Sequence, residues 1–125
     1  MSRRYPQLLI DDMLTSIEKI QQFIVGMEPD VWLASELHKD AIIRNLEIIG
    51  EAANQLTEEV RALAPEIPWS MIISLRNRLI HEYHGVNWKI ALPIVLNDLP
   101  VLKGQLQSLQ EIAPKIVEYE KDKEQ

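Results

Sequence analysis

The segment AIIRNLEIIGEAANQLTEEVRAL, residues 41–63, constrains the fold more than any other part of the chain. Its apolar side chains recur every three or four positions, which places them on one face of an α-helix. The members of this stripe are Ile42, Leu46, Ile49, Ala53, Leu56, Val60 and Leu63. The same spacing extends through most of the chain, and the period of two that is typical of strands is absent. The sequence therefore predicts an all-α protein, with this helix at about residues 39–64.

Proline and glycine predict the ends of the helices in the first third of the chain. The first helix is expected to start at Pro6 and to run to about Val25, because Gly26 is a plausible stop. A short helical piece is expected in residues 29–38, with Asp30 or Ser35 as its cap.

Three prolines organise the prediction for the second half of the chain. Pro68 is well placed to open a helix that continues to about His84. Asn87 can cap the final helix, which Pro93 and Pro100 should kink or split. Gly50, inside the long helix, is expected to permit the close approach of a neighbouring helix.

These elements together predict an up-down bundle of four long helices plus a short one, the last helix being kinked by prolines. The length of 125 residues suits one domain, which we place at residues 1–125 with a frayed, solvated tail from about residue 118. We find no linker and no internal repeat in the sequence.

Composition narrows the function classes. Hydrophobic residues make up 46% of the chain, enough for one core, and the absence of cysteine excludes disulfides, thiol nucleophiles and cysteine zinc sites. We find no signal peptide and no apolar run near the roughly 20 residues that cross a bilayer, so we expect a cytoplasmic protein without membrane contact. A net charge of -6 argues against a general nucleic-acid binder but permits a local basic cleft.

The stretch RNRLIHEYHG, residues 76–85, concentrates cations and proton carriers in this acidic chain. If the stretch is helical, at about 100° per residue, five of its polar side chains share an arc of less than half the circumference. These are Arg76, Asn77, His81, Tyr83 and His84. Because Ile73 and Ile80 interrupt this arc, the pattern favours the wall of a cleft over an open surface.

The chemistry of these side chains suits RNA cleavage without a metal or cofactor. Histidine, with an unperturbed pKa of about 6.5, can take a proton from a 2′-hydroxyl and give one to a leaving 5′-oxygen. Arg76 can stabilise the negative charge that develops on the phosphoryl oxygens. Tyr83 can donate a hydrogen bond or stack on a base, and Asn77 could orient the ring of His81.

Two other interpretations fit the same residues. Arginine and histidine near a helix C-terminus are favoured by the helix dipole alone, so the arc could be a solvated face. HEYH, residues 81–84, could suggest a metal site, but it lacks the H-E-x-x-H spacing and a third ligand, so we expect no metal.

Trp32, Trp69 and Trp88 are expected in the core or at caps rather than as platforms for bases.

The stretch RNRLIHEYHGVN resembles the R-x4-6-H-x-Y motif of the HepT-like ribonucleases, a branch of the HEPN superfamily. Arg76, His81 and Tyr83 stand at the three motif positions. The segments AIIRNLEIIGEAANQL, PEIPWSMIISLRN and IVLNDLPVLKGQL also resemble family segments, in the same order. The resemblance covers residues from about Tyr5 to Leu109.

The resemblance implies an all-α homodimer whose motif helices face a shared cleft, and a metal-independent endoribonuclease toxin of a toxin-antitoxin system. It implies an antitoxin that is a minimal nucleotidyltransferase and transfers AMP to the motif tyrosine. Arg76 and His81 would then be catalytic and Tyr83 would carry the AMP group. Asn77 and His84 are supporting candidates, although His84 lies outside the motif and receives no family role.

Two hypotheses from other classes remain open. In the first, the chain is a non-catalytic binding module that forms a complex with a nucleotidyltransferase, and Arg76, His81 and Tyr83 make a docking or nucleotide-binding surface. In the second, it is a plain structural bundle. A short nucleotidyltransferase encoded next to this chain would support the ribonuclease toxin and the binding module, and would weaken the structural bundle.

Overall fold

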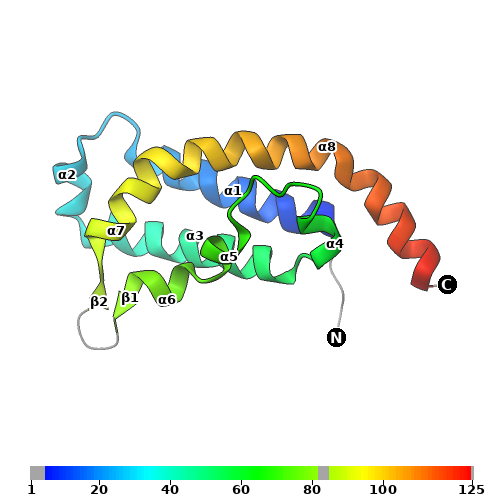
Figure 1. The fold of residues 1–125 in the computed structure, drawn as a ribbon. Coiled ribbons are helices and arrows are strands. Elements are labelled where there is room, and N and C mark those ends of the chain that lie inside the picture. Colours follow the sequence, from blue (N-terminus) through cyan, green and yellow to red (C-terminus); the bar gives the residue numbers. More distant parts are fainter. Residues whose placement is uncertain (1–4, 82–84, 125) are drawn as a thin grey trace.

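The fold is an all-α bundle in which successive long segments run in alternating directions (Figure 1). The computed structural model describes residues 5–81 and 85–124, and the side chains of residues 5–79 and 85–113. The longest helices are α1 (Pro6–Ile24), α3 (Glu36–Gln55) and α8 (Leu99–Glu124). Helix α1 packs against both α3 and α8, so it forms the centre of the bundle.

Helix α1 begins and ends where the sequence predicts. Pro6 is the first helical residue, a position where its missing N–H costs nothing. The chain turns at Gly26, whose φ of 73° lies in the left-handed region that glycine adopts without strain. The short α2 (Pro29–Leu33) follows, with Asp30 in its first turn rather than as its cap.

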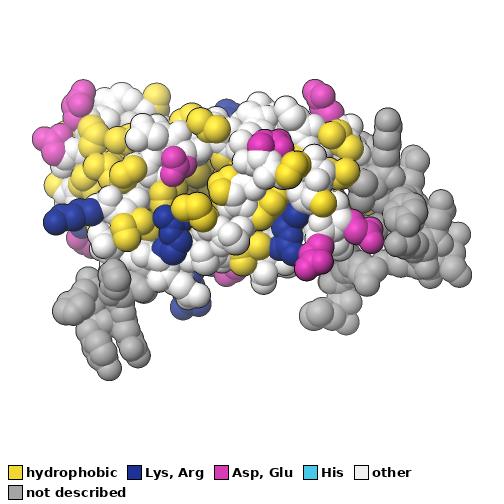
Figure 2. Space-filling view, viewed as in Figure 1, with side chains coloured by type: hydrophobic (Ala, Val, Ile, Leu, Met, Phe, Trp, Pro, Cys, Tyr) yellow, Lys and Arg dark blue, Asp and Glu magenta, His cyan; other side chains and the backbone are white. Residues whose placement is uncertain are grey.

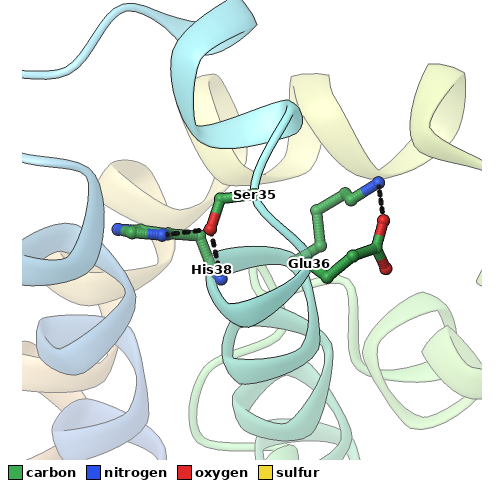
Figure 3. Close-up of polar contacts among 4 residues, drawn as sticks. Ser35, Glu36 and His38 are labelled. Carbon is green, nitrogen blue, oxygen red and sulfur yellow. Dashed lines mark hydrogen bonds and ion pairs between the residues drawn. The ribbon is translucent and has the colours of Figure 1, made fainter.

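Ser35 caps α3 rather than the short helix before it. Its Oγ accepts a hydrogen bond of 3.3 Å from the backbone N–H of His38 and lies 2.8 Å from Nδ1 of the same residue (Figure 3). Lys39 pairs with Glu36 one turn apart, with 2.9 Å between Nζ and Oε1. His38 is thus a residue at a helix start.

The long helix predicted over residues 39–64 is divided in the structure. Helix α3 ends at Gln55, and Thr57 then caps the one-turn α4 (Glu58–Arg61) by accepting from the N–H of Val60 at 3.2 Å. The apolar stripe is nevertheless buried as far as Val60, whereas Leu63 is 38% exposed. The predicted helical period of the apolar residues was right, but the prediction of one continuous helix was wrong. The cap at Thr57 competes with continuation of the helix.

The helix predicted from Pro68 to His84 is also divided, and it ends earlier. Pro68 precedes α5 (Trp69–Ile73), and Ser74 separates α5 from α6 (Leu75–Leu79). Two short antiparallel strands follow, β1 (Ile80–His81) and β2 (Gly85–Val86). The chain therefore leaves the helix five residues before the predicted end.

The last long segment contains the predicted interruption. Asn87 caps α7 (Trp88–Pro93) by accepting from the N–H of Lys89 at 3.1 Å. A π-turn, η1 (Ile94–Asp98), follows Pro93, since the N–H of Leu99 donates to the carbonyl of Ile94 five residues earlier. Pro100 lies in the first turn of α8, which continues as helix to Glu124 where the sequence suggested a frayed end.

One hydrophobic core joins all the long segments. Its fully buried members come mainly from α1, α3 and α8 and include Ile10, Met13, Ile17, Ile20, Ile42, Leu46, Ile49, Leu99, Leu106 and Leu109. Polar groups inside are bonded locally, as where the Nδ2 of Asn45 donates to the carbonyl of Ala41 at 2.8 Å.

Tryptophans fix the shorter elements to this core. Trp32 is fully buried and meets Trp88 edge to face at 5.9 Å between ring centroids, which joins α2 to α7. The indole N–H of Trp69 lies 3.0 Å from the carbonyl oxygens of both Arg61 and Ala64, which holds the start of α5 against the end of α4. The prediction that the tryptophans serve the core and the caps agrees with these contacts.

The predicted all-α bundle is thus confirmed, with one of its four long helices replaced by the broken pair α5 and α6. Within the described ranges, no helix is long and apolar enough to cross a membrane.

Candidate functional site

Arg76 and Asn77 are the two candidate residues whose side chains the structure describes. Both lie on α6, and both are exposed, whereas their neighbours Leu75 and Leu79 are buried against the core. The buried leucines fix the orientation of this short helix, so Arg76 faces solvent. Among the described residues, no carboxylate forms an ion pair with Arg76. Its guanidinium is therefore available for an anion.

His81 lies on β1, two residues beyond the end of α6. Its backbone pairs with Gly85, and Ile80 pairs with Val86. Gly85 has a φ of 71°, so the hairpin closes through a conformation that favours glycine. The side chain of His81 lies outside the described part of the structure, as do Tyr83 and His84 entirely.

The predicted helical arc is wrong for His81, whereas its members Tyr83 and His84 lie outside the described residues. Arg76 and Asn77 share α6, but His81 belongs to a strand, so the rotation of 100° per residue does not relate them. Asn77 does not lie one helical turn before His81, and its orienting role loses that support. Arg76 and His81 therefore lie on two successive elements, α6 and β1, on either side of the helix-to-hairpin junction.

Asn87 connects the hairpin to both flanking helices. Its backbone N–H donates to the carbonyl of Leu79, the last residue of α6, at 2.8 Å, while its side chain caps α7. The sequence identified the cap but not the bond to α6. The only signal for this bond was a capping residue two positions after a glycine.

The charge around this junction differs from that of the whole chain. Residues 66–98 hold three basic residues, Arg76, Arg78 and Lys89, and three acidic residues, Glu66, Glu82 and Asp98, in a chain of net charge -6. This segment is neutral within an acidic chain, so a phosphate would be repelled less here than by the chain as a whole. Figure 2 shows Lys and Arg side chains on the face that carries α5 and α6.

An apolar groove lies beside the junction, between α5–α6 and η1–α8, with a cavity volume of about 310 Å³. Met71 and Leu75 line it from one wall, and Leu99 and Val101 line it from the other. Met71 is 49% exposed and Val101 62% exposed, so this apolar surface meets solvent in a single chain (Figure 2). A groove of this kind is typical of a surface that another molecule covers.

Opposite charges stand on the two walls of this groove. Arg78 lines it from α6 and Asp98 from η1. No ion pair joins these two side chains, and neither pairs with another described residue. Sequence analysis assigned no role to Arg78 or Asp98. The signals it missed were Met71 and Val101, large apolar residues on the outward side of their helices.

No group of His, Asp or Glu side chains suited to a metal ion occurs among the described residues. The HEYH residues lie largely outside the described part of the structure. The expectation that they bind no metal therefore still rests on the sequence alone.

The fold and the junction define a class: an all-α bundle with an exposed arginine on a short helix that passes into a hairpin. A family model described as Ribonuclease HepT-like matches residues 13–109. The chain therefore belongs to the HepT-like ribonuclease family, as its motif and flanking segments indicated.

Curated relatives agree with this assignment. The chain is 36% identical over 101 residues to a probable ribonuclease HepT of Thermococcus cleftensis, covering 81% of this chain and 92% of the relative. It is 32% identical over 107 residues to a putative RNase of Methanocaldococcus jannaschii, covering 86% and 98%. A putative RNase of Caldanaerobacter subterraneus subsp. tengcongensis is 32% identical over 104 residues, covering 83% and 93%. No solved structure gives a significant match.

Proposed function

We propose that this chain is a metal-independent endoribonuclease and the toxin of a toxin-antitoxin system. The observation that carries the proposal is the placement of Arg76, exposed and without a carboxylate partner among the described residues, five residues before His81 at the helix-to-hairpin junction. The family and the names of the relatives supply the class of reaction.

The proposed reaction divides the work between two residue types. One histidine takes the proton of the 2′-hydroxyl, and the oxygen attacks the adjacent phosphorus. The bond from phosphorus to the 5′-oxygen breaks, and that oxygen receives a proton from a second histidine. Arg76 stabilises the extra negative charge on the phosphoryl oxygens. The products carry a 2′,3′-cyclic phosphate and a free 5′-hydroxyl.

The test is RNA cleavage by the purified chain in EDTA. We expect cleavage to survive and His81→Ala to lower it at least about 10²-fold, the usual contribution of a positioned acid or base. His38→Ala is the matched control, since it removes a histidine outside the motif. Full activity of a folded His81→Ala protein would instead support the non-catalytic binding module.

The mechanism needs two histidines on opposite sides of the phosphate, so we propose that the active form is a homodimer. The groove between α5–α6 and η1–α8 is the surface we assign to it. Because Arg78 and Asp98 stand on opposite walls, a two-fold axis would bring each beside its opposite in the second copy. Leu75 and Arg78 line the groove on the same short helix that carries Arg76, so a copy seated there lies next to the junction.

We further propose that a minimal nucleotidyltransferase controls the chain by transferring AMP to Tyr83. Tyr83 lies two residues from His81 in the sequence, and an AMP group adds bulk and a negative charge beside Arg76. Tyr83 lies outside the described part of the structure, so this support rests on the sequence and on the chemistry of the AMP group.

The control is tested by incubating the chain with ATP and the nucleotidyltransferase encoded next to it. We expect the mass of one or more AMP groups on the peptide that contains Tyr83, loss of RNA cleavage, and no labelling of Tyr83→Phe. Labelling confined to Tyr5 or Tyr119, or full activity after complete labelling of Tyr83, would contradict the proposal.

A further inference from the structure

Gly50 lies inside α3, is buried, and faces the turn between α5 and α6. A β-carbon built at Gly50 would lie 3.0 Å from the carbonyl oxygen of Ile72, 3.8 Å from that of Ile73 and 4.0 Å from the β-carbon of Leu75. The expectation that this glycine permits a close approach is thereby confirmed. What approaches it is the backbone that leads directly into the helix of Arg76.

The carbonyl that Gly50 faces belongs to a hydrogen-bonded turn. The N–H of Ser74 donates to the carbonyls of Ile72 and Ser70, and the hydroxyl of Ser74 donates to the carbonyl of Ser70 at 2.8 Å. The N–H of Arg78 then donates to the carbonyl of Ser74 at 3.0 Å. Because these bonds link the turn to α6, a displacement of the Ile72 carbonyl is passed on to α6.

Buried side chains before and after Ser74 also hold the turn in place. Ile72 and Leu75 are 6% and 4% exposed, so both are fixed in the core on either side of Ser74. Helix α3 packs against both α5 and α6, which makes it the common support of the two. A methyl group at Gly50 would require a movement of a few tenths of an ångström from backbone atoms rather than from a flexible side chain.

We infer that Gly50 is a positioning residue for Arg76. The missing side chain lets α3 support the α5–α6 turn at contact distance, and this sets where α6 presents the guanidinium. The catalytic readout of this inference rests on the proposed ribonuclease function, whereas its structural readout does not.

The test compares Gly50→Ala with Gly104→Ala. Gly104 lies in α8, is exposed, and has no atom within 4 Å of a built β-carbon, so its replacement changes helix propensity without a contact. For Gly50→Ala we expect kcat for RNA cleavage to fall about 10-fold, since catalytic groups must be held within about 0.5 Å. KM should change less than about twofold, because Arg76 acts on the transition state. Gly104→Ala should leave both unchanged.

The structural readout is an NMR spectrum that resolves the Nε–H of Arg76 and the amides of residues 72–79. These signals should shift in Gly50→Ala and not in Gly104→Ala, whether or not the chain cleaves RNA. An inactive wild-type chain with these shifts would remove the ribonuclease proposal and keep the positioning role.

Three outcomes would overturn the inference. The first is an unshifted Arg76 signal in Gly50→Ala, and the second is a wild-type kcat in an active preparation. The third is a Gly50→Ala chain that does not fold at any temperature by circular dichroism, since Gly50 would then serve core packing alone.

Discussion

At the scale of single residues, short polar side chains and one arginine carry most of the information. Ser35, Thr57 and Asn87 each accept a backbone N–H at the start of a helix, so each fixes a boundary. Arg76 differs because it is exposed and has no carboxylate partner among the described residues, so its charge does not stabilise the fold through an ion pair. Its value is expected to lie in function.

Arg76→Lys tests whether the fork of the guanidinium matters beyond its charge. Lysine keeps the positive charge but cannot bind two phosphoryl oxygens in one plane, so we expect kcat to fall at least about 10-fold. Steady-state cleavage of a short fluorescent RNA measures this.

Arg44→Lys is the matched control, since Arg44 is an exposed arginine of α3 outside the junction. Equal activity of Arg76→Lys and the wild type would show that only a point charge is needed at this position.

At the scale of elements, the junction depends on α6 ending at Leu79. In a longer helix, His81 would share the helix axis with Arg76. In the structure, the backbone of His81 instead belongs to the strand that follows α6. Two features end the helix. The Leu79 carbonyl accepts from Asn87 rather than from a residue further along a helix, and Gly85 supplies the positive φ that the hairpin uses. Helix α7 follows at once and is fixed by Trp88 against Trp32.

Asn87→Ala should therefore affect both stability and cleavage. The lost cap of α7 is expected to cost about 1 kcal/mol of unfolding free energy, measured by urea denaturation. Because α7 anchors the exit of the hairpin, we also expect RNA cleavage to fall severalfold under conditions where the protein is fully folded.

Ser35→Ala removes a cap of the same kind from α3 and should cost a similar free energy without the loss of cleavage. If the two variants lose activity equally, the effect of Asn87 is on stability alone.

At the scale of the whole molecule, an exposed apolar groove lies beside the junction that carries Arg76. The groove has Arg78 on one wall and Asp98 on the other, which makes it complementary to itself. Light scattering should report about twice the 14.5 kDa mass of the chain. Val101→Glu, at a side chain that is 62% exposed in the groove, should yield a monomer, because it places a charge in the apolar contact.

Leu37→Glu is the control for this substitution, since Leu37 is 78% exposed but does not line the groove.

A charge reversal tests the pairing of Arg78 with Asp98 between the two copies. Arg78→Asp and Asp98→Arg should each weaken the dimer, and the double variant should restore it. A wild-type chain that is monomeric at micromolar concentration and still cleaves RNA would contradict the assignment of the dimer.

The local sequence determined the class of fold and most helix starts. Apolar spacing over residues 41–63 made α3 amphipathic, and Pro6 and Asn87 marked where two helices begin. These properties depend on neighbours within about four residues, so a sequence displays them directly. The motif also located Arg76 and His81 as candidates, because it is a short run of the chain.

Only the tertiary structure decided how those candidates are arranged. RNRLIHEYHG is compatible with a helix over its whole length, yet the chain bends at Ser74 and leaves the helix after Leu79. The deciding contacts come from elsewhere: Gly50 admits the α5–α6 turn from α3, and Asn87 takes the last carbonyl of α6. The groove likewise joins residues about 30 positions apart, such as Met71 and Val101. Packing between distant segments outweighs the small differences in local propensity that a sequence shows. The sequence could therefore identify the candidate residues of the junction but could not predict their arrangement.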